Sequence, residues 1–235
     1  MKNINDVCVI VQARLGSQRI PKKMIKSFAG STLLDILFTK LTKSKVIPKD
    51  NIHFSVYDKE LEDIGRKHGI NIWNRSEESA KSEGDPLYEI FDWYDKLPYK
   101  YFIIVSSCNP LLRVETIDSF FTKFIESDKE GCLGVFEKKT YYWDKNGKAI
   151  TDWKGSTRMN NKFIDPIFEA AHCLYASRMD IVGDNYYMDT KSPIEPELFI
   201  MNELETFDID YQWQFEIGEV MYGKDNILYT KQEQL

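Results

Sequence analysis

Residues 9–23 decide how the rest of the chain is interpreted, and they read Val9-Ile10-Val11-Gln12-Ala13-Arg14-Leu15-Gly16-Ser17-Gln18-Arg19-Ile20-Pro21-Lys22-Lys23. The apolar run predicts a short buried strand, and the Gly, Ser and Pro residues after it predict a loop. From Arg14 to Lys26 the chain carries five basic residues and no acidic one. Main-chain N–H groups around Gly16 and Ser17 can bind phosphate oxygens. The pattern therefore predicts a nucleotide site at the carboxyl edge of a parallel sheet.

A solvated basic surface is the other interpretation of this loop. The stretch matches neither the G-x-G-x-x-G dinucleotide fingerprint nor the G-x-x-x-x-G-K-[ST] phosphate loop. The loop is nevertheless a local cluster of positive charge in an acidic protein, because the 235 residues carry a formal net charge of −6. Such a cluster produces a positive electrostatic potential that attracts polyanions.

Length, charge and cysteine spacing exclude several classes of protein. The length suits one α/β domain, and the acidic balance argues against broad nucleic-acid binding, which needs an extended basic face. The four cysteines are far apart and form no C-x-x-C pair, so neither a zinc site nor a disulfide framework is implied. We find no signal peptide and no membrane-spanning run, and we expect a cytoplasmic protein without membrane contact.

The first half of the chain alternates predicted strands and helices. Strands are expected at 7–12, 51–57, 70–73, 101–106 and 132–136, and helices at 32–41, 59–68, 86–96 and 114–126. Thr32 and Asp35 have capping-box spacing, Asp85-Pro86 resembles a cap followed by a first-turn proline, and Gly69 suits a helix end. This rhythm predicts an α/β, Rossmann-like fold, with a mainly parallel sheet and helices on both faces.

The second half changes character. Residues 138–165 are expected to form an inserted arm or lid, with a β-hairpin turn at Asp144-Lys145-Asn146-Gly147. The Tyr and Trp residues of 141–153 could stack on a ligand, pack a lid or form a dimer interface. Further strands are expected at 168–175 and 199–202, and a closing helix at 211–221. Since no flexible linker divides the chain, residues 1–235 are interpreted as one domain.

Two carboxylates stand two residues apart in Phe207-Asp208-Ile209-Asp210. In an extended segment Asp208 and Asp210 point to the same side, and Ile209 points into the core. Mg²⁺ binds through one or two carboxylates and substrate phosphate oxygens, so the pair is a candidate metal site. The alternative is that Asp210 simply caps the following helix.

At this point the chain resembles a known family. Residues 9–23 resemble the signature of the cytidylyltransferase group that includes CMP-sialic acid (acylneuraminate) synthetases and related spore-coat polysaccharide biosynthesis proteins. The segment from Ser106 to Arg113 resembles their strand and loop with a Pro-Leu pair. Asp208-Ile209-Asp210 resembles their metal-binding Asp-x-Asp. The resemblance extends over most of the chain and implies a nucleotidyltransferase fold.

The resemblance also implies roles for individual residues. Arg14 and Lys23 would hold a triphosphate, with Ala13, Gly16 and Ser17 contributing from the turn. Arg75 matches an arginine near the base pocket, and Asp208 and Asp210 would hold Mg²⁺. The residues assigned to the acceptor side are Ser106, Asn109, Arg158 and His172. His172 could equally be a satisfied residue at a sheet edge.

Departures from the sialate-type pattern fall mainly on the acceptor side. Met24 stands where those enzymes have Asn, and Ser106 where they have Gln. Ala171-His172 replace Asn-Gly, and Glu169 lies close to an expected arginine. A carboxylate in place of a cation would repel an acceptor carboxylate, so we expect N-acetylneuraminate to be a poor acceptor.

The sequence therefore predicts a Mg²⁺-dependent cytidylyltransferase, catalysed by Arg14, Lys23, Asp208 and Asp210. It would transfer CMP from CTP to a small anionic acceptor, such as a nonulosonic-acid-like sugar acid, with release of pyrophosphate for surface polysaccharide or glycan synthesis. A homodimer is expected. The alternatives are a metal-dependent glycosyltransferase, a nucleotidyltransferase for a phosphorylated or phosphonate acceptor, and a nucleotide-binding regulator without activity.

Overall fold

The computed structural model describes residues 1–81, 86–155, 157–186 and 192–224. Its strands are β1 Val7–Gln12, β2 Ile52–Val56, β3 Asn71–Asn74, β4 Tyr101–Val105, β5 Gly131–Lys138, β6 Ile167–Arg178 and β7 Pro196–Ile200. Its α-helices are α1 Leu33–Thr42, α2 Lys59–Lys67, α3 Glu77–Lys81, α4 Leu87–Ile90, α5 Val114–Glu126, α6 Asp180–Gly183 and α7 Gln212–Gly223. Short 3-10 turns are η1 Ile4–Asp6, η2 Lys49–Asn51, η3 Asn161–Phe163 and η4 Glu203–Thr206.

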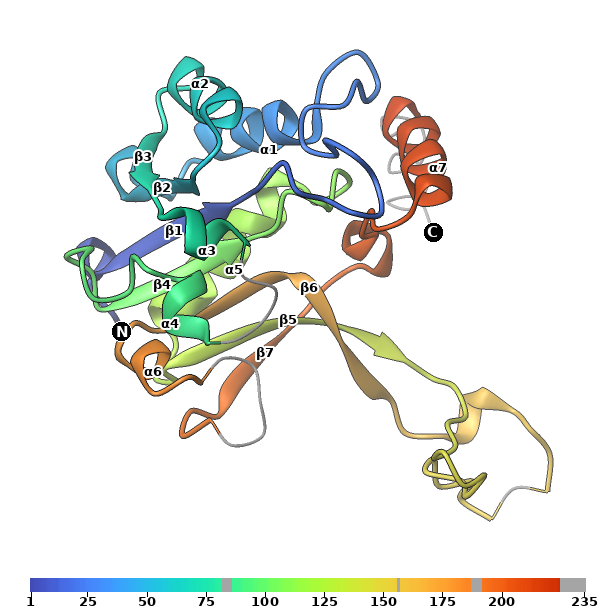
Figure 1. Cartoon of the computed structure of the whole chain (residues 1–235). Helices are drawn as coiled ribbons and strands as arrows, with labels where there is room; N and C mark the ends of the chain where they lie inside the picture. Colours follow the sequence, from blue (N-terminus) through green and yellow to red (C-terminus); the bar gives the residue numbers. More distant parts are fainter. Residues whose placement is uncertain (82–85, 156, 187–191, 225–235) are drawn as a thin grey trace.

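The seven strands form one sheet in the order β3-β2-β1-β4-β6-β5-β7 (Figure 1). β1 pairs in parallel with β2 and β4, and β5 pairs in parallel with β7. β6 is antiparallel to both of its neighbours. The Rossmann-like, mainly parallel sheet predicted from the sequence is therefore confirmed.

Side chains of β1 alternate between two cores. Val7, Val9 and Val11 belong to a core that includes residues of α1 and α5, such as Phe38 and Phe120. Cys8 and Ile10 belong to the opposite core, which contains Phe91, Trp93 and Val182. Because successive strand residues point to opposite faces, this arrangement confirms helices on both faces of the sheet.

Local signals in the first half act as the sequence predicts. The Thr32 Oγ1 accepts from the Asp35 N–H at 3.0 Å and so caps α1. Gly69 follows α2 with φ of 69°, a conformation that glycine adopts without strain.

The helix predicted for 86–96 is wrong in length. α4 covers only Leu87–Ile90, Pro86 is its cap rather than its first residue, and Asp85 lies outside the described residues. The Tyr94 N–H bonds to the Phe91 carbonyl instead of the Ile90 carbonyl. The Ile90 carbonyl accepts instead from the side chains of Gln12 and Ser79, so tertiary contacts end the helix.

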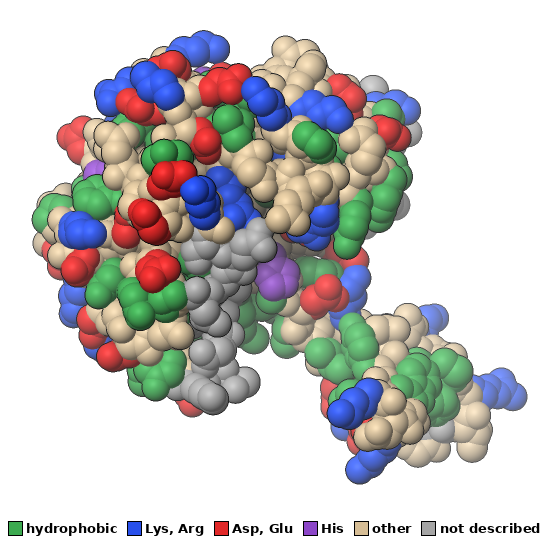
Figure 2. All heavy atoms as spheres, in the orientation of Figure 1, with side chains coloured by type: hydrophobic (Ala, Val, Ile, Leu, Met, Phe, Trp, Pro, Cys, Tyr) green, Lys and Arg blue, Asp and Glu red, His purple; other side chains and the backbone are tan. Residues whose placement is uncertain are grey.

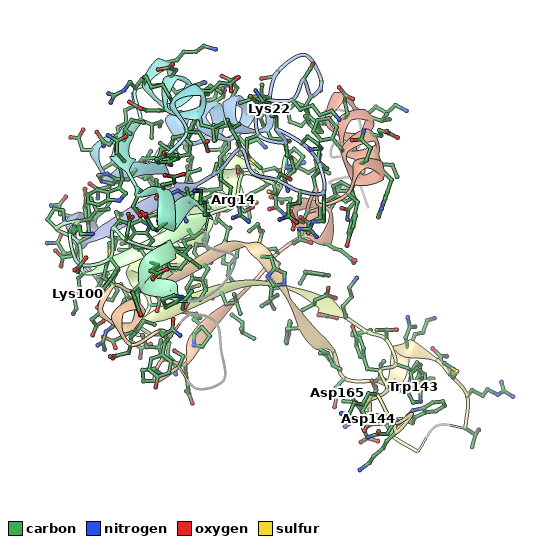
Figure 3. The ribbon with its side chains drawn as sticks, viewed as in Figure 1. Arg14, Lys22, Lys100, Trp143, Asp144 and Asp165 are labelled. Carbon is green, nitrogen blue, oxygen red and sulfur yellow. The ribbon has the colours of Figure 1, made fainter. Side chains whose placement is uncertain are left out.

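An arm projects from the body between β5 and β6 (Figure 1). It contains the hairpin turn at Asp144, where the Gly147 N–H bonds to the Asp144 carbonyl at 3.0 Å. The rings of Tyr141 and Trp153 lie 4.7 Å apart, and Lys154 pairs with Asp165. Figure 3 places Trp143, Asp144 and Asp165 in the arm, away from Arg14. The hairpin turn is thus confirmed, whereas the role of the arm stays a prediction.

No helix in the described ranges is long and apolar enough to cross a membrane.

Candidate active site

A cavity of about 670 Å³ lies where the loops after β1, β3 and β4 meet. This is the carboxyl edge of the parallel strands, at the point where the chain order of the sheet reverses beside β1. The cavity lies within the usual volume range for small-molecule sites. Its lining residues are Gln12, Ala13, Arg14, Ser17, Gln18, Arg19, Lys23, Met24, Arg75, Ser79, Ala80, Ile90, Ser106, Ser107 and Cys108.

Hydrophobic packing holds the loop after β1 against the Asp-x-Asp segment. Ile20 and Ile209 are both fully buried in one cluster with Phe28 and Phe215 of α7. The Ile209 N–H also bonds to the Cys108 carbonyl after β4, at 3.0 Å. Two motifs almost 190 residues apart are thereby fixed at one end of the cavity.

Lys23 joins these motifs directly. Its side chain is buried, and Nζ donates to the Ile209 carbonyl at 2.5 Å and lies 3.6 Å from the Asp210 carboxylate. Arg19 reaches the same carboxylate at 2.7 Å. Two cations of the basic loop therefore surround Asp210, and the end of the cavity combines both signs of charge.

Asp208 has an unusual environment. Its Oδ1 is buried and has no hydrogen-bond partner among the described residues. Burial raises the pKa of this carboxyl, and the neighbouring Asp210 raises it further, against the opposing charges of Lys23, His172 and Arg19. A buried, unsatisfied carboxylate oxygen next to a second carboxylate is suited to accept a hard cation.

The alternative role of Asp210 as a helix cap is wrong. The cap of α7 is Tyr211, and Gln214 accepts hydrogen bonds from the N–H groups of Asp210 and Tyr211 at 2.8 Å. The Asp210 carboxylate instead pairs with Arg19 and Lys23 of the loop after β1.

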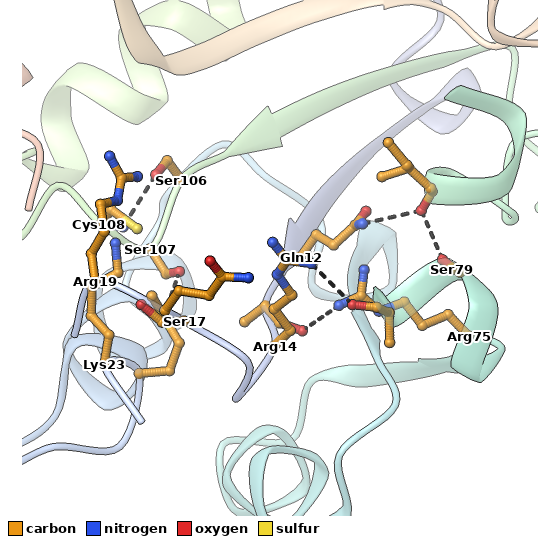
Figure 4. Close-up of a pocket in the computed structure, with 15 residues that line it drawn as sticks. Gln12, Arg14, Ser17, Arg19, Lys23, Arg75, Ser79, Ser106, Ser107 and Cys108 are labelled. Carbon is orange, nitrogen blue, oxygen red and sulfur yellow. Dashed lines mark hydrogen bonds between the residues drawn. The ribbon is translucent and has the colours of Figure 1, made fainter. Parts of the chain in front are cut away.

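Two guanidinium groups occupy the other part of the cavity, shown in Figure 4. Arg75 is only 5% exposed, and its Nη2 donates to the Ala13 carbonyl at 2.7 Å. Burial lowers the pKa of Arg75 to about 10, and the nearby charge of Arg14 contributes in the same direction. Arg75 remains cationic at neutral pH, so this part of the cavity favours an anionic ligand.

The structure brings most of the predicted nucleotide-binding residues together. Ala13, Arg14, Ser17, Lys23 and Arg75 all line the cavity. Gly16 lies in the same loop without lining it, and a Cβ at that position would meet no atom within 4 Å.

The predicted acceptor residues are more dispersed. Ser106 lines the cavity, whereas Asn109 does not line it and is buried with its Nδ2 bonded to the Thr206 carbonyl. His172 is exposed on β6, outside the cavity but close to Asp208. Arg158 lines a separate hollow in the arm with Tyr141 and so does not join the others.

Glu169 is also outside the cavity. It is exposed on the part of β6 that leads into the arm, opposite Phe136, and its charge contributes to raising the pKa of Lys138. The cavity wall therefore carries no carboxylate from this position.

Sequence reasoning missed several residues of the site. Arg19 belonged to the basic loop but was not assigned a role, although it forms the shortest contact with Asp210. Gln12 and Ser79 share the Ile90 carbonyl at the wall of the cavity. The last residue of a strand that leads into a binding loop is a signal that could have identified Gln12.

The fold and this cavity define an α/β protein with a small-molecule site at the carboxyl edge of its sheet. Residues 8–181 match the family model described as cytidylyltransferase. The chain therefore belongs to the cytidylyltransferase family.

The chain is similar to three other proteins over part or most of its length. It is 37% identical over 81 residues to the spore coat polysaccharide biosynthesis protein SpsF of Bacillus subtilis, covering 32% of this chain and 34% of that protein. It is 21% identical to the pseudaminic acid cytidylyltransferase of Campylobacter jejuni, covering 94% and 97%. It is 24% identical to the 3-deoxy-manno-octulosonate cytidylyltransferase of Francisella tularensis, covering 65% and 60%. The chain thus spans about a third of the first of these relatives and 60% of the third.

Solved structures share the fold at low identity. The CMP:2-keto-3-deoxy-manno-octonic acid synthetase complexed with CTP has a TM-score of 0.68 at 11% identity, covering 93% of this chain and 99% of that one. A cytidylyltransferase from Leptospira borgpetersenii has a TM-score of 0.64 at 14% identity, covering 97% and 95%.

Proposed function

We propose that this protein transfers CMP from CTP to the hydroxyl of a sugar acid and releases pyrophosphate. The observation that carries the proposal is the contact of Lys23 with Ile209 and Asp210, because it brings cations of the basic loop and the carboxylate pair to one end of the cavity. Family membership supports CTP as the nucleotide. Relatives named for pseudaminic acid and 3-deoxy-manno-octulosonate support a sugar-acid acceptor.

Different residues of the cavity bind different parts of the two substrates. Arg14 and Lys23 bind the β and γ phosphates and neutralise the pyrophosphate as the bond to the α-phosphorus breaks. Arg75 binds the nucleoside end of CTP, and Ser106 borders the acceptor. Most of the rate enhancement then comes from holding the acceptor oxygen in line with the α-phosphorus.

Mg²⁺ fits the carboxylate pair. Asp208 and Asp210 would hold it, as the unsatisfied Asp208 oxygen suggests. The described residues contain no group of three or more His, Cys, Asp or Glu that could form an all-protein metal cage. Two carboxylates are enough for Mg²⁺, since phosphate oxygens and water complete its coordination. Bound there, the ion would neutralise phosphate charge and lower the pKa of the acceptor hydroxyl.

The biological setting belongs to the same proposal. The SpsF relative supports a product destined for a surface polysaccharide. We place its synthesis in the cytoplasm as part of the proposal. We also propose a homodimer in which the arm contributes to the interface. Ile150, Met159 and Phe163 of the arm are each more than 60% exposed in the single chain, and burying such side chains favours association.

A pyrophosphate-release assay tests the proposed function. CTP and the other nucleoside triphosphates are each incubated with Mg²⁺ and one acceptor, drawn from 3-deoxy-manno-octulosonate, pseudaminic acid, N-acetylneuraminate and a set of phosphorylated or phosphonate metabolites. We expect release with CTP and a sugar acid. Nucleoside diphosphate released from a sugar nucleotide would identify a glycosyltransferase instead, and release only with phosphorylated acceptors would reassign the substrate.

A further inference from the structure

Asp58 stands directly before α2, but its carboxylate does not cap that helix. An Asp at this position usually accepts a hydrogen bond from an N–H group of the first helical turn. The Asp58 carbonyl accepts from the N–H groups of Leu61 and Glu62. Its side chain, in contrast, accepts no hydrogen bond from the described residues of α2. The carboxylate is therefore used elsewhere.

The partner of this carboxylate is the loop after β1. Asp58 Oδ2 accepts a hydrogen bond from the Leu15 N–H at 3.0 Å. The Leu15 carbonyl accepts from the Ser17 N–H at 2.8 Å, and the Leu15 side chain packs against the main hydrophobic core. Neither Leu15 nor Asp58 lines the cavity, whereas Arg14 and Ser17 on either side of the turn do. The fixed position of Leu15 thus determines how the loop presents these two residues to the cavity.

The charge of Asp58 is unfavourable for a site that binds a polyanion. Asp58 is close enough to Arg75 to act on that guanidinium. Burial lowers the pKa of Arg75 to about 10, and the carboxylates of Asp92 and Asp58 oppose the shift. The same negative charge would repel the phosphates of a nucleotide. A favourable contribution of Asp58 to nucleotide binding must therefore come from the hydrogen bond that it accepts.

We propose that Asp58 is a positioning residue, which holds the turn at 14–17 in the conformation that binds the triphosphate of CTP. The inference rests on the proposed function, because it requires that this loop binds the phosphates. Asp58 acts through the backbone of the loop and touches neither substrate. Without the contact the turn would have more conformations available, and binding would have to order it.

Two substitutions of Asp58 separate the hydrogen bond from the charge. Serine is well suited to the position before a helix, but its side chain is too short to place an oxygen where Asp58 Oδ2 lies. Asparagine keeps a carbonyl oxygen at that distance and removes the charge. Glu219→Ala is the matched control. The Glu219 carboxylate of α7 accepts from the Ala29 N–H of the same loop at 2.7 Å, but Ala29 is not part of the cavity lining.

Calorimetric titration measures the affinities for CTP and CMP, and thermal denaturation measures stability. We expect Asp58→Ser to weaken CTP binding about tenfold, the effect of one hydrogen bond to a charged group, and CMP binding less than about threefold. Asp58→Asn should bind CTP within about twofold of the wild type. Asp58→Ser and Glu219→Ala should both melt about 2–4 °C lower, but Glu219→Ala should bind CTP as the wild type does.

Three results would overturn the inference. The first is an unchanged affinity for CTP in Asp58→Ser. The second is an equal loss of CTP affinity in Asp58→Ser and Glu219→Ala, which would indicate general loosening of the loop. The third is a CTP affinity of Asp58→Asn as low as that of Asp58→Ser, which would assign the effect to the charge.

Binding and turnover together separate this inference from the proposed function. If the wild type binds CTP but releases no pyrophosphate with any acceptor, the proposed function fails, and the titrations with CTP still decide the role of Asp58. If the wild type does not bind CTP, both fail. If the wild type is active and Asp58→Ser binds CTP equally well, only the role of Asp58 is refuted.

Discussion

At the scale of one residue, the buried carboxyl of Asp208 makes the stability of the fold depend on pH. The same carboxyl is a proposed metal ligand. Burial and Asp210 raise its pKa above the ordinary value of 3.8, so the folded protein holds a proton there more tightly than the unfolded chain does. The stabilisation is therefore complete below pH 3.8 and is lost as the pH rises through the raised pKa of the folded state. Once it is ionised, Asp208 destabilises the fold relative to its protonated form.

Asp208→Asn should therefore raise the melting temperature at pH 7 while abolishing turnover. The gain should shrink as the pH falls below the raised pKa of Asp208, where the wild-type carboxyl is protonated as well. Thermal denaturation at a series of pH values measures it, and Glu216→Gln on exposed α7 serves as the control. A gain that does not depend on pH would contradict the electrostatic explanation.

Asp210→Ala should remove activity with little effect on stability. Asp210 does not cap α7, and its ion pair with Arg19 is solvent-exposed, with 52% and 32% of the two side chains accessible. Exposed pairs contribute about 0.2–1 kcal/mol, so the variant should melt close to the wild type. Pyrophosphate release across a Mg²⁺ titration checks the prediction. Full Mg²⁺-dependent activity in a folded variant would show that the metal is held elsewhere.

Residue-scale prediction succeeded where the signal was local. Thr32 caps α1, and Ile209 is fully buried between the two carboxylates, as period-two alternation requires. The contact between Arg19 and Asp210 could not be predicted, because nothing local to either residue encodes a partner 191 positions away. His172 was assigned from the resemblance alone, and its φ of 53° depends on a bulge of β6 opposite Gly134.

At the scale of elements, we expect the loop after β1 to bind the anionic end of the nucleotide. Lys23→Met keeps the length of the buried stem but removes the charge that lies near Asp210. Affinity for CTP should fall about 10- to 100-fold, the size of one hydrogen bond to a charged group, whereas affinity for CMP should change little. Calorimetric titration of both nucleotides decides it. Equal losses for CTP and CMP would show that Lys23 does not face the pyrophosphate end.

A control for this loop comes from Lys22. Its side chain pairs with Glu60 of α2 at 3.2 Å and is 63% exposed, outside the cavity lining. Lys22→Met should therefore bind both nucleotides as the wild type does. Comparison of the two adjacent lysines separates a direct phosphate contact from the general charge of the loop.

The bounds of an element could be predicted where its backbone hydrogen bonds are made within the element itself. α5 begins at Val114 and ends at Glu126, as the sequence predicts. α4 was overestimated because the Ile90 carbonyl bonds to Gln12 and Ser79, and because Phe91 and Trp93 turn into the core beneath the sheet. Tertiary packing decides such a segment, and the local pattern does not report it.

At the scale of the whole molecule, alternation of strands and helices predicted the class of fold but not the strand order. β6 inserts between β4 and β5 and runs antiparallel to both. The sequence predicts that β6 exists, but pairing partners are set by the closure of the whole sheet. The same antiparallel pair leads into the arm, so β6 connects the bulge at His172 to the most distant part of the protein (Figure 1).

The arm provides the test at this largest scale. Figure 2 shows hydrophobic side chains gathered on its visible face, apart from the main body. Phe163 is 63% exposed in the single chain, so Phe163→Glu should weaken a homodimer that buries it without disturbing the core. We expect sedimentation velocity to show a dimer for the wild type and a rise in dissociation constant of about tenfold or more for the variant. Val46→Glu, at an exposed apolar residue after α1, should leave the association unchanged. A wild type that remains monomeric at high concentration would exclude the dimer and leave closure over the cavity as the function of the arm to be tested.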